Sequence, residues 1–203
     1  MDPVIVTFIF SVVVTIMSIV LHEVAHGWVA RMLGDKTAEY AGRLTLNPLK
    51  HLDPIGSVVI PIVTYFAGLP GFGWAKPVPY NPANLTKDMK YGPLKVALAG
   101  PGTNILIAIV FALLARLFIP GGNVSLIGAF TFIALVNAFL AGLNLIPIPP
   151  FDGSKILSII APRLWEKVSR IGAAGFLIAF FVAYAFAGVI AQIATFFVAL
   201  VAT

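Results

Sequence analysis

Hydrophobic residues along this chain come in long runs that no charged residue or histidine interrupts. Five such runs cover residues 3–21, 54–75, 96–115, 117–151 and 171–203. A helix needs about 20 mainly apolar residues to cross the hydrocarbon core of a bilayer. The pattern therefore predicts four membrane-spanning helices, over about 4–33, 93–119 and 124–145 and within 171–203. Segment 54–75 is a fifth apolar run, and the pattern alone does not assign it to a full span.

The segments between the spans differ in character. Residues 54–75 hold several Pro and Gly residues, and their cleanest apolar stretch, 58–69, has only 12 residues, which is typical of a re-entrant or interfacial piece. Residues 37–53 alternate weakly between polar and apolar positions, as a short strand does. Prolines at 77, 79 and 82 exclude helix and central strand, so an extended edge or loop is expected there. A short helix is expected over 154–160.

These elements predict an all-α polytopic membrane protein. It should have about four full transmembrane helices, a re-entrant or interfacial segment, and short strand-like elements between the first two spans. Composition agrees, because 60% of the residues are hydrophobic and 10% are charged, against about 45–50% and 25% in soluble domains. That bias excludes both an ordinary soluble fold and a disordered chain. The sequence has no cysteine, so disulfides and thiolate metal sites are excluded as well.

The net charge of +5 predicts an orientation rather than a nucleic-acid partner. Basic residues lie in segments 31–53, 76–95 and 152–170, and no run is dense enough for a nucleic-acid patch. Lys and Arg between spans mark the cytoplasmic side. Placing all three segments there requires that 54–75 does not cross the membrane fully.

The first span contains the residues with the clearest chemistry, in the run HEVAH. His22 and His26 are four residues apart, so both imidazoles face one side of a helix and can reach one metal ion. Glu23 lies one residue further round, where it can take a proton from a metal-bound water. Ionisable residues at membrane depth are costly and usually functional. The alternative is a structural hydrogen-bond cluster between helices.

A catalytic zinc site usually takes three protein ligands, and Asp152 is the candidate for the third. It lies in NLIPIPPFDG (144–153), where three prolines end the helix and leave carbonyl groups without intrahelical partners. Such backbone is tolerated at membrane depth only where it is buried or faces water. The alternative is that Asp152 and Gly153 form a simple turn and cap at the membrane surface.

HEVAH together with NLIPIPPFDG resembles the site-2 protease family of intramembrane zinc metalloproteases. The resemblance extends to AGPGTN (99–104) and GWAKPVPYNP (73–82). It implies one zinc ion per chain, bound by His22, His26 and Asp152, with Glu23 as general base and acid. It also implies supporting roles for Asn144 and Asn104. The family's PDZ-type and cystathionine-synthase-type domains are not expected in this chain.

The resemblance implies a single membrane-embedded protease domain over 1–203, with a core over 4–160 and an additional span within 171–203. Its partners would be the lipid bilayer and a transmembrane protein or peptide, cut within or near the membrane. The expected location is the cell membrane, with the active site nearer the cytoplasmic side. Segments 38–46 or 73–84 could hold an unwound substrate by strand addition at an edge.

Several alternatives stay open. A membrane metal carrier or a non-catalytic scaffold could use the same ligands, and spacing alone does not exclude iron or cobalt. His51 is expected either as an interfacial polar residue or as part of the substrate path. The sequence does not decide whether the chain forms a homo-oligomer.

Overall fold

The computed structural model describes residues 2–66, 75–170 and 173–202, and the regular elements in these ranges are all helices. Four of them are long and apolar enough to cross a membrane: α1, α4, α5 and the part of α8 from Phe181 to Ala202. The chain is therefore a multi-pass membrane protein, as predicted. The helices are α1 (Pro3–Met32), α2 (Thr37–Tyr40), α3 (Ile60–Phe66), α4 (Gly92–Phe118), α5 (Val124–Asn144), α6 (Asp152–Ile160), α7 (Pro162–Ser169) and α8 (Ala173–Ala202), with short 3-10 or π turns at η1 (Pro48–Lys50), η2 (Pro54–Val59) and η3 (Pro82–Asn84).

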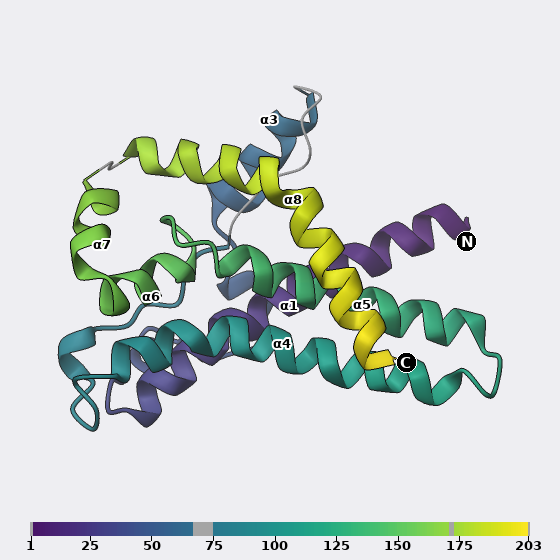
Figure 1. The fold of residues 1–203 in the computed structure, drawn as a ribbon, viewed down its shortest axis with the longest axis horizontal. Coiled ribbons are helices and arrows are strands. Elements are labelled where there is room, and N and C mark those ends of the chain that lie inside the picture. Colours follow the sequence, from purple (N-terminus) through teal and green to yellow (C-terminus); the bar gives the residue numbers. More distant parts are fainter. Residues whose placement is uncertain (1, 67–74, 171–172, 203) are drawn as a thin grey trace.

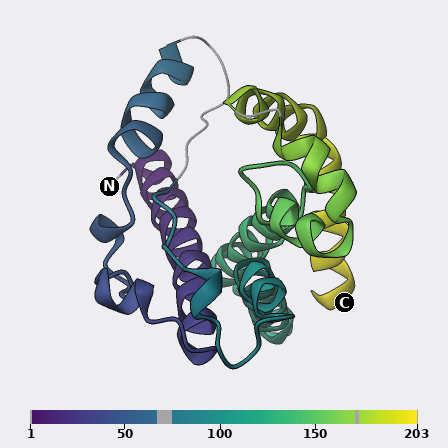
Figure 2. The ribbon, with the colours of Figure 1, turned by 90° about the vertical axis from the view of Figure 1, so that its left-hand side faces the viewer.

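Helix α4 is the centre of the bundle. It packs against α1 on one side and against α5 and α8 on the other, while α6 lies across its N-terminal half (Figure 1). The view along the bundle shows α1, α4 and α5 side by side, with α3 and α8 on opposite flanks (Figure 2). Small side chains allow close approach, as at Ala112 and Ala134, which pack with Val198 where α4, α5 and α8 meet. Such residues favour helix association in lipid.

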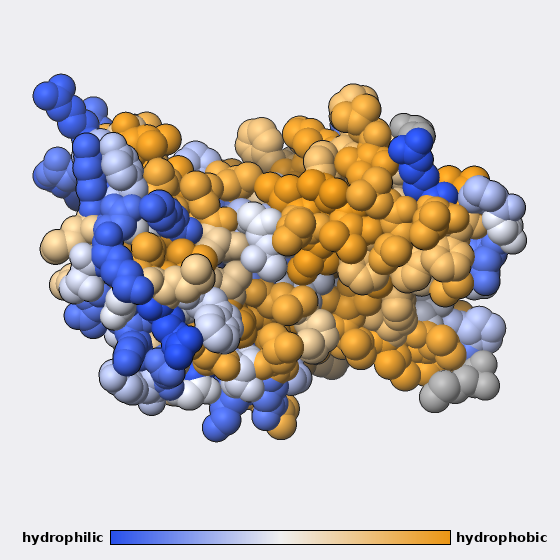
Figure 3. Space-filling view, turned by 90° about the horizontal axis from the view of Figure 1, so that it is seen from below, coloured by the Kyte–Doolittle hydropathy of each residue, from blue (hydrophilic) through white to orange (hydrophobic). Residues whose placement is uncertain are grey.

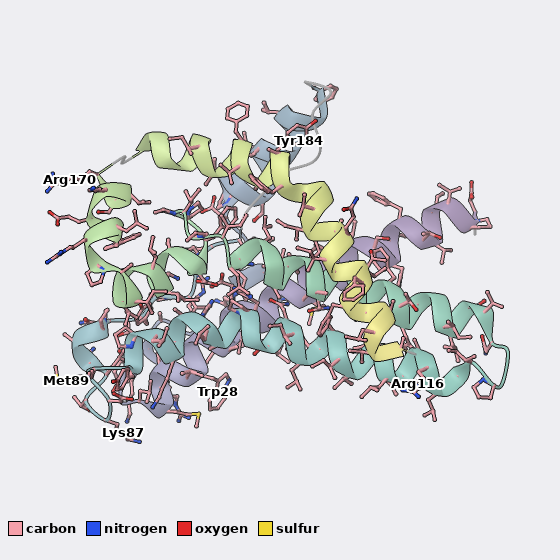
Figure 4. The ribbon with its side chains drawn as sticks, viewed as in Figure 1. Trp28, Lys87, Met89, Arg116, Arg170 and Tyr184 are labelled. Carbon is pink, nitrogen blue, oxygen red and sulfur yellow. The ribbon has the colours of Figure 1, made fainter. Side chains whose placement is uncertain are left out.

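The surface is divided into an apolar middle and polar ends. Hydrophobic side chains cover the middle of the molecule, and hydrophilic ones gather most densely at one end (Figure 3). Lys87, Met89 and Arg170 lie at that end, whereas Arg116 lies at the other (Figure 4). This distribution fits a bilayer that surrounds the middle of the bundle.

The prediction of a strand in 37–53 is wrong. The segment forms α2, a series of turns and η1, and no strand occurs in the described part of the chain. Residues in 43–46 instead make hydrogen bonds with other parts of the chain. The Arg43 guanidinium donates to the Lys76 carbonyl oxygen over 2.6 Å, and His51 Nε2 lies 2.8 Å from the Thr45 carbonyl oxygen. Among the described residues, the backbone N–H of Lys76 donates to the His51 carbonyl oxygen, and a single bond of this kind does not make a ladder.

Segment 54–66 is helical, with the π turn η2 running into α3. Asp53 caps it by accepting from the backbone N–H groups of Ile55 and Gly56. The six residues of η2 and the seven of α3 together span about 20 Å at 1.5 Å per residue. This is less than the roughly 30 Å of a hydrocarbon core. Residues 67–74 lie outside the described residues, so the re-entrant path stays a prediction.

A buried carboxylate holds the end of α1 against the segment that precedes α4. Asp35 accepts hydrogen bonds from the Thr37 N–H and hydroxyl, the Asn81 N–H and the Asn84 amide. Burial alone would raise the pKa of Asp35, but these hydrogen bonds outweigh it and hold the pKa below its usual value. Gly34 makes the turn into this site with a φ of +114°, which disfavours other residues. The hydrogen bonds of Asp35 thus hold the end of the extended segment 75–81 beside α1.

Candidate metal centre

Three side chains that are distant in the sequence meet where α1 passes the start of α6. His22 and His26 lie one turn apart on α1, and Asp152 is the first residue of α6. Their Nε2, Nε2 and Oδ2 atoms approach one another to 2.9, 3.0 and 3.1 Å. All three side chains are buried, and together they form a group that could hold a metal ion.

Two glycines make room for this cluster. A Cβ atom at Gly100 of α4 would collide with the Nε2 atoms of both histidines, at 2.5 Å from that of His22. A Cβ atom at Gly153 would collide with the carbonyl oxygens of Leu145 and Ile146, the latter at 2.5 Å. Because these two residues have no side chain, α4 can lie against the histidine pair and the start of α6 can lie against the end of α5.

Hydrogen bonds on the far side of each imidazole fix where its proton lies. His26 Nδ1 lies 2.6 Å from the Val96 carbonyl oxygen, which can only accept, so Nδ1 carries the proton. His22 Nδ1 lies 2.6 Å from Asn104 Oδ1 and donates in the same way. In the neutral form of each ring, the Nε2 lone pair faces a carboxylate oxygen of Asp152, and a metal ion between the three atoms would turn this repulsion into bonding.

The donor set fits zinc. Two imidazole nitrogens and one carboxylate oxygen are the ligands of a catalytic zinc site, with a fourth position open for water. Zinc–ligand bonds of about 2.0–2.1 Å at tetrahedral angles would separate the ligand atoms by roughly 3.3 Å. The observed separations are a few tenths of an ångström shorter, so zinc needs only a small spreading of the three side chains. Both histidines also have the outer hydrogen-bond partners that ligating histidines normally have.

Glu23 faces the same pocket from the next position of α1. Its Oε2 accepts a hydrogen bond of 2.8 Å from the backbone N–H of Val78 in the extended segment, and the residue lines the pocket. The prolines at 77 and 79 leave Val78 as the one residue of 77–79 that can donate from its backbone. The run KPVP thus holds one carboxylate oxygen of Glu23 in place through the Val78 N–H.

A pocket of about 370 Å³ opens beside the cluster. Lys155 stands in it, with Nζ 2.8 Å from Asp152 Oδ1, so the two oxygens of Asp152 are divided between the lysine and the histidines. Burial would lower the pKa of the Lys155 ammonium, but the Asp152 charge outweighs burial and raises the pKa above its usual value. The other walls are mostly apolar and include Ile19, Ala75, Pro77, Leu140, Leu143, Pro150 and Phe151.

The remaining residues singled out in the sequence lie at different distances from the cluster. Asn104 contacts His22 directly. Asn144 lines the pocket, but its amide donates to the Leu140 carbonyl of its own helix, 3.0 Å away. His51 is not among the residues that line the pocket, and it is 1% exposed, so it is neither a surface residue nor part of the pocket wall.

Sequence reasoning missed four contributors. Lys155 follows Asp152 by three residues on α6, a spacing that brings side chains together on a helix. Asn137 accepts a hydrogen bond from Asn104 and donates one to Ser18. Asn137 and Ser18 are both polar residues inside apolar spans, which is a usable signal. The contribution of Val78 comes from its backbone N–H, so its side-chain type does not predict it. The prolines on both sides do indicate that this backbone belongs to neither a helix nor a sheet.

Comparison with known proteins finds several relatives that are named as zinc metalloproteases. The chain is 36% identical over 179 residues to "Putative zinc metalloprotease YwhC" of Bacillus subtilis, covering 83% of this chain and 77% of that protein. It is 33% identical to "Putative zinc metalloprotease Rip2" of Mycolicibacterium smegmatis, over 80% of this chain and 60% of the relative. It is 29% identical to "Zinc metalloprotease MJ0392" of Methanocaldococcus jannaschii, over 72% and 33% respectively. No family model matches the chain, and no solved structure matches it.

Proposed function

The chain belongs to the site-2 protease family of zinc metalloproteases, and from that premise we propose that it hydrolyses peptide bonds within or near the transmembrane segments of other membrane proteins. The observation that carries the proposal is the meeting of His22, His26 and Asp152 beside Glu23, inside a bundle of four apolar helices. The protease domain is taken as the whole chain, 1–203, which acts on a transmembrane protein or peptide.

In this proposal, His22, His26 and Asp152 hold the zinc ion. Bound zinc lowers the pKa of a coordinated water to about 7 and polarises a peptide carbonyl group. Glu23 accepts a proton from the attacking water at Oε1 and returns it to the leaving amine, while the Val78 N–H holds Oε2 in place. The Lys155 ammonium neutralises the second oxygen of Asp152.

The pocket favours an apolar, locally extended substrate. Its walls are mostly aliphatic and aromatic, and a helical substrate hides its carbonyl groups, so it must unwind before it is cut. Segment 38–46 is not a strand. In segment 76–79, the N–H groups of Lys76 and Val78 are already bonded, and Pro77 and Pro79 have none. Pairing of a substrate with 76–79 would therefore depend on carbonyl acceptors alone.

The proposed orientation places the active site nearer the cytoplasmic side of the cell membrane. His26 lies six residues before the end of α1, which is about 9 Å along the helix. The same end of the bundle holds Lys87 and Arg170, and Lys and Arg favour the cytoplasmic side (Figure 4).

Two variants test the proposal. Glu23→Gln removes the proton acceptor and leaves the three ligands, whereas Asp152→Ala removes a ligand. Each protein is purified in detergent without chelator for zinc analysis. Each is also expressed at equal level in the source organism lacking the native gene, and the new amino termini of membrane proteins are compared by mass spectrometry.

We expect about one zinc per chain in the wild type and in Glu23→Gln, and much less in Asp152→Ala. New termini inside or beside apolar spans should appear with the wild type alone. A wild-type chain that binds no zinc would refute the metal site. Unchanged cleavage by Glu23→Gln would refute the role of Glu23, and zinc binding without any cleavage would favour a carrier.

A further inference from the structure

A line of buried polar side chains extends from the metal cluster into the apolar middle of the bundle. Asn104 on α4 contacts His22, and its amide Nδ2 donates to Asn137 Oδ1 on α5 over 2.8 Å. Asn137 Nδ2 in turn donates to Ser18 Oγ on α1, over 2.9 Å. Asn104 and Asn137 are 0% exposed and Ser18 is 4% exposed. Three helices thus meet through amide and hydroxyl groups where apolar contacts would suffice for packing.

The direction of these hydrogen bonds is set at the end remote from the metal cluster. Asn137 Nδ2 also donates to the Ile133 carbonyl oxygen, one turn back on α5, over 2.9 Å. A carbonyl can only accept, so the NH₂ group of Asn137 must face Ile133 and Ser18. Both of its protons are then used, and Oδ1 is the atom left to face Asn104.

The orientation of Asn137 determines that of Asn104. If the Asn104 amide turned over, its oxygen would face Asn137 Oδ1 with no proton between them, and two buried acceptors would lose their partners. The NH₂ group of Asn104 would then face His22 Nδ1. That contact would stabilise the tautomer with its proton on Nε2, and a protonated Nε2 cannot bind a metal ion.

We propose that Asn137 is a positioning residue that acts through Asn104 to keep the Nε2 lone pair of His22 available for zinc. Asn137 does not touch the ligands, and its effect passes through two hydrogen bonds, of 2.8 Å and 2.6 Å. The proposal rests on the proposed function, because it concerns the zinc site that this function requires. Partners outside the ligand shell typically change metal affinity 10- to 100-fold.

The test compares Asn137→Leu with Ser18→Ala. Asn137→Leu is similar in size and removes the control over Asn104. Ser18→Ala removes a buried hydrogen bond of the same network but leaves the bonds of Asn137 to Ile133 and Asn104. The zinc dissociation constant is measured by competition with a chelator in detergent. The tautomer of His22 is read from ¹⁵N spectra of metal-free protein labelled at histidine, with His22→Gln for assignment.

We expect Asn137→Leu to bind zinc about tenfold more weakly and to show both tautomers of His22. Ser18→Ala should keep the wild-type affinity within about threefold and keep the proton on Nδ1. Wild-type affinity and a single tautomer in Asn137→Leu, with a lower unfolding temperature, would reduce Asn137 to a packing role.

If Asn137→Leu does not fold, the ¹⁵N spectra of the metal-free wild type still test the proposal. A His22 whose Nδ1 carries no proton in the metal-free wild type would overturn the proposal. The readouts also separate it from the proposed function. A wild-type chain that binds no zinc refutes the function, whereas zinc binding that is indifferent to Asn137 refutes only the positioning role.

Discussion

Replacing Gly100 with alanine tests whether the metal site depends on how closely α4 approaches α1. The added methyl carbon would lie 2.5 Å from His22 Nε2, whereas ordinary contacts begin at 3.4 Å. Either α4 must move away or the imidazoles must turn, by at least about 0.9 Å. Metal–ligand distances are held to within about 0.2 Å, so the three ligands could no longer bind one ion together. We expect zinc affinity and proteolysis each to fall about 100-fold or more.

Gly102→Ala is the matched control for this experiment. It makes the same change on the same helix, but a Cβ atom there meets nothing within 4 Å. The gain in helix propensity, up to about 1 kcal/mol, is common to both variants. The assay is zinc competition with a chelator, with unfolding of the metal-free proteins as a check on the fold. Zinc binding by Gly100→Ala equal to that of Gly102→Ala would refute the argument that the missing side chain creates the site.

Two further predictions concern the start of α6 and the buried carboxylate at the end of α1. Gly153→Ala should weaken zinc binding about 10- to 100-fold, because a Cβ atom 2.5 Å from the Ile146 carbonyl oxygen displaces Asp152. The control is Gly128→Ala, which adds a Cβ atom in open space on α5 and should leave the zinc dissociation constant unchanged. Asp35→Asn should lower the free energy of unfolding by about 2 kcal/mol at pH 7, since it replaces an accepting oxygen with an NH₂ group in front of buried donors. Because the pKa of Asp35 is lowered in the folded chain, its contribution is complete above about pH 4 and is lost as the pH falls through the folded value. Chemical unfolding in detergent should therefore show the wild type and Asp35→Asn converging below pH 4, and a constant difference at every pH would contradict this reasoning.

The long helices could be predicted from the sequence because a bilayer leaves the chain few choices. Span boundaries expected at 4–33, 93–119 and 124–145 agree within a residue or so with α1, α4 and α5. Runs of apolar residues without charges must satisfy their backbone internally, and a helix does so within one segment. The pairing of HEVAH with a distant aspartate was likewise accessible, since few ionisable residues occur near the spans.

The connections were harder to predict because distant partners decide their structure. The alternation at 43–46 looks like a strand, but Arg43 bonds the Lys76 carbonyl and no neighbouring strand is present among the described residues. The shape of 37–53 depends on residues 75–78, which lie more than twenty positions later. Asn137 is comparable, because its role depends on a neighbour from α4 that spacing along α5 does not reveal.

The separation of His26 and Asp152 along the chain also governs when the site can come into being. They are 126 residues apart, and a ribosome adds about 5–20 residues per second, so the third ligand is made roughly 6–25 s after the second. During that interval α1 enters the bilayer with Glu23 and both histidines, but without the carboxylate that would complete a zinc site. The ligands converge only after α4 and α5 have followed and α6 has folded back. The proposed metal site therefore cannot be complete until the chain has been made as far as α6.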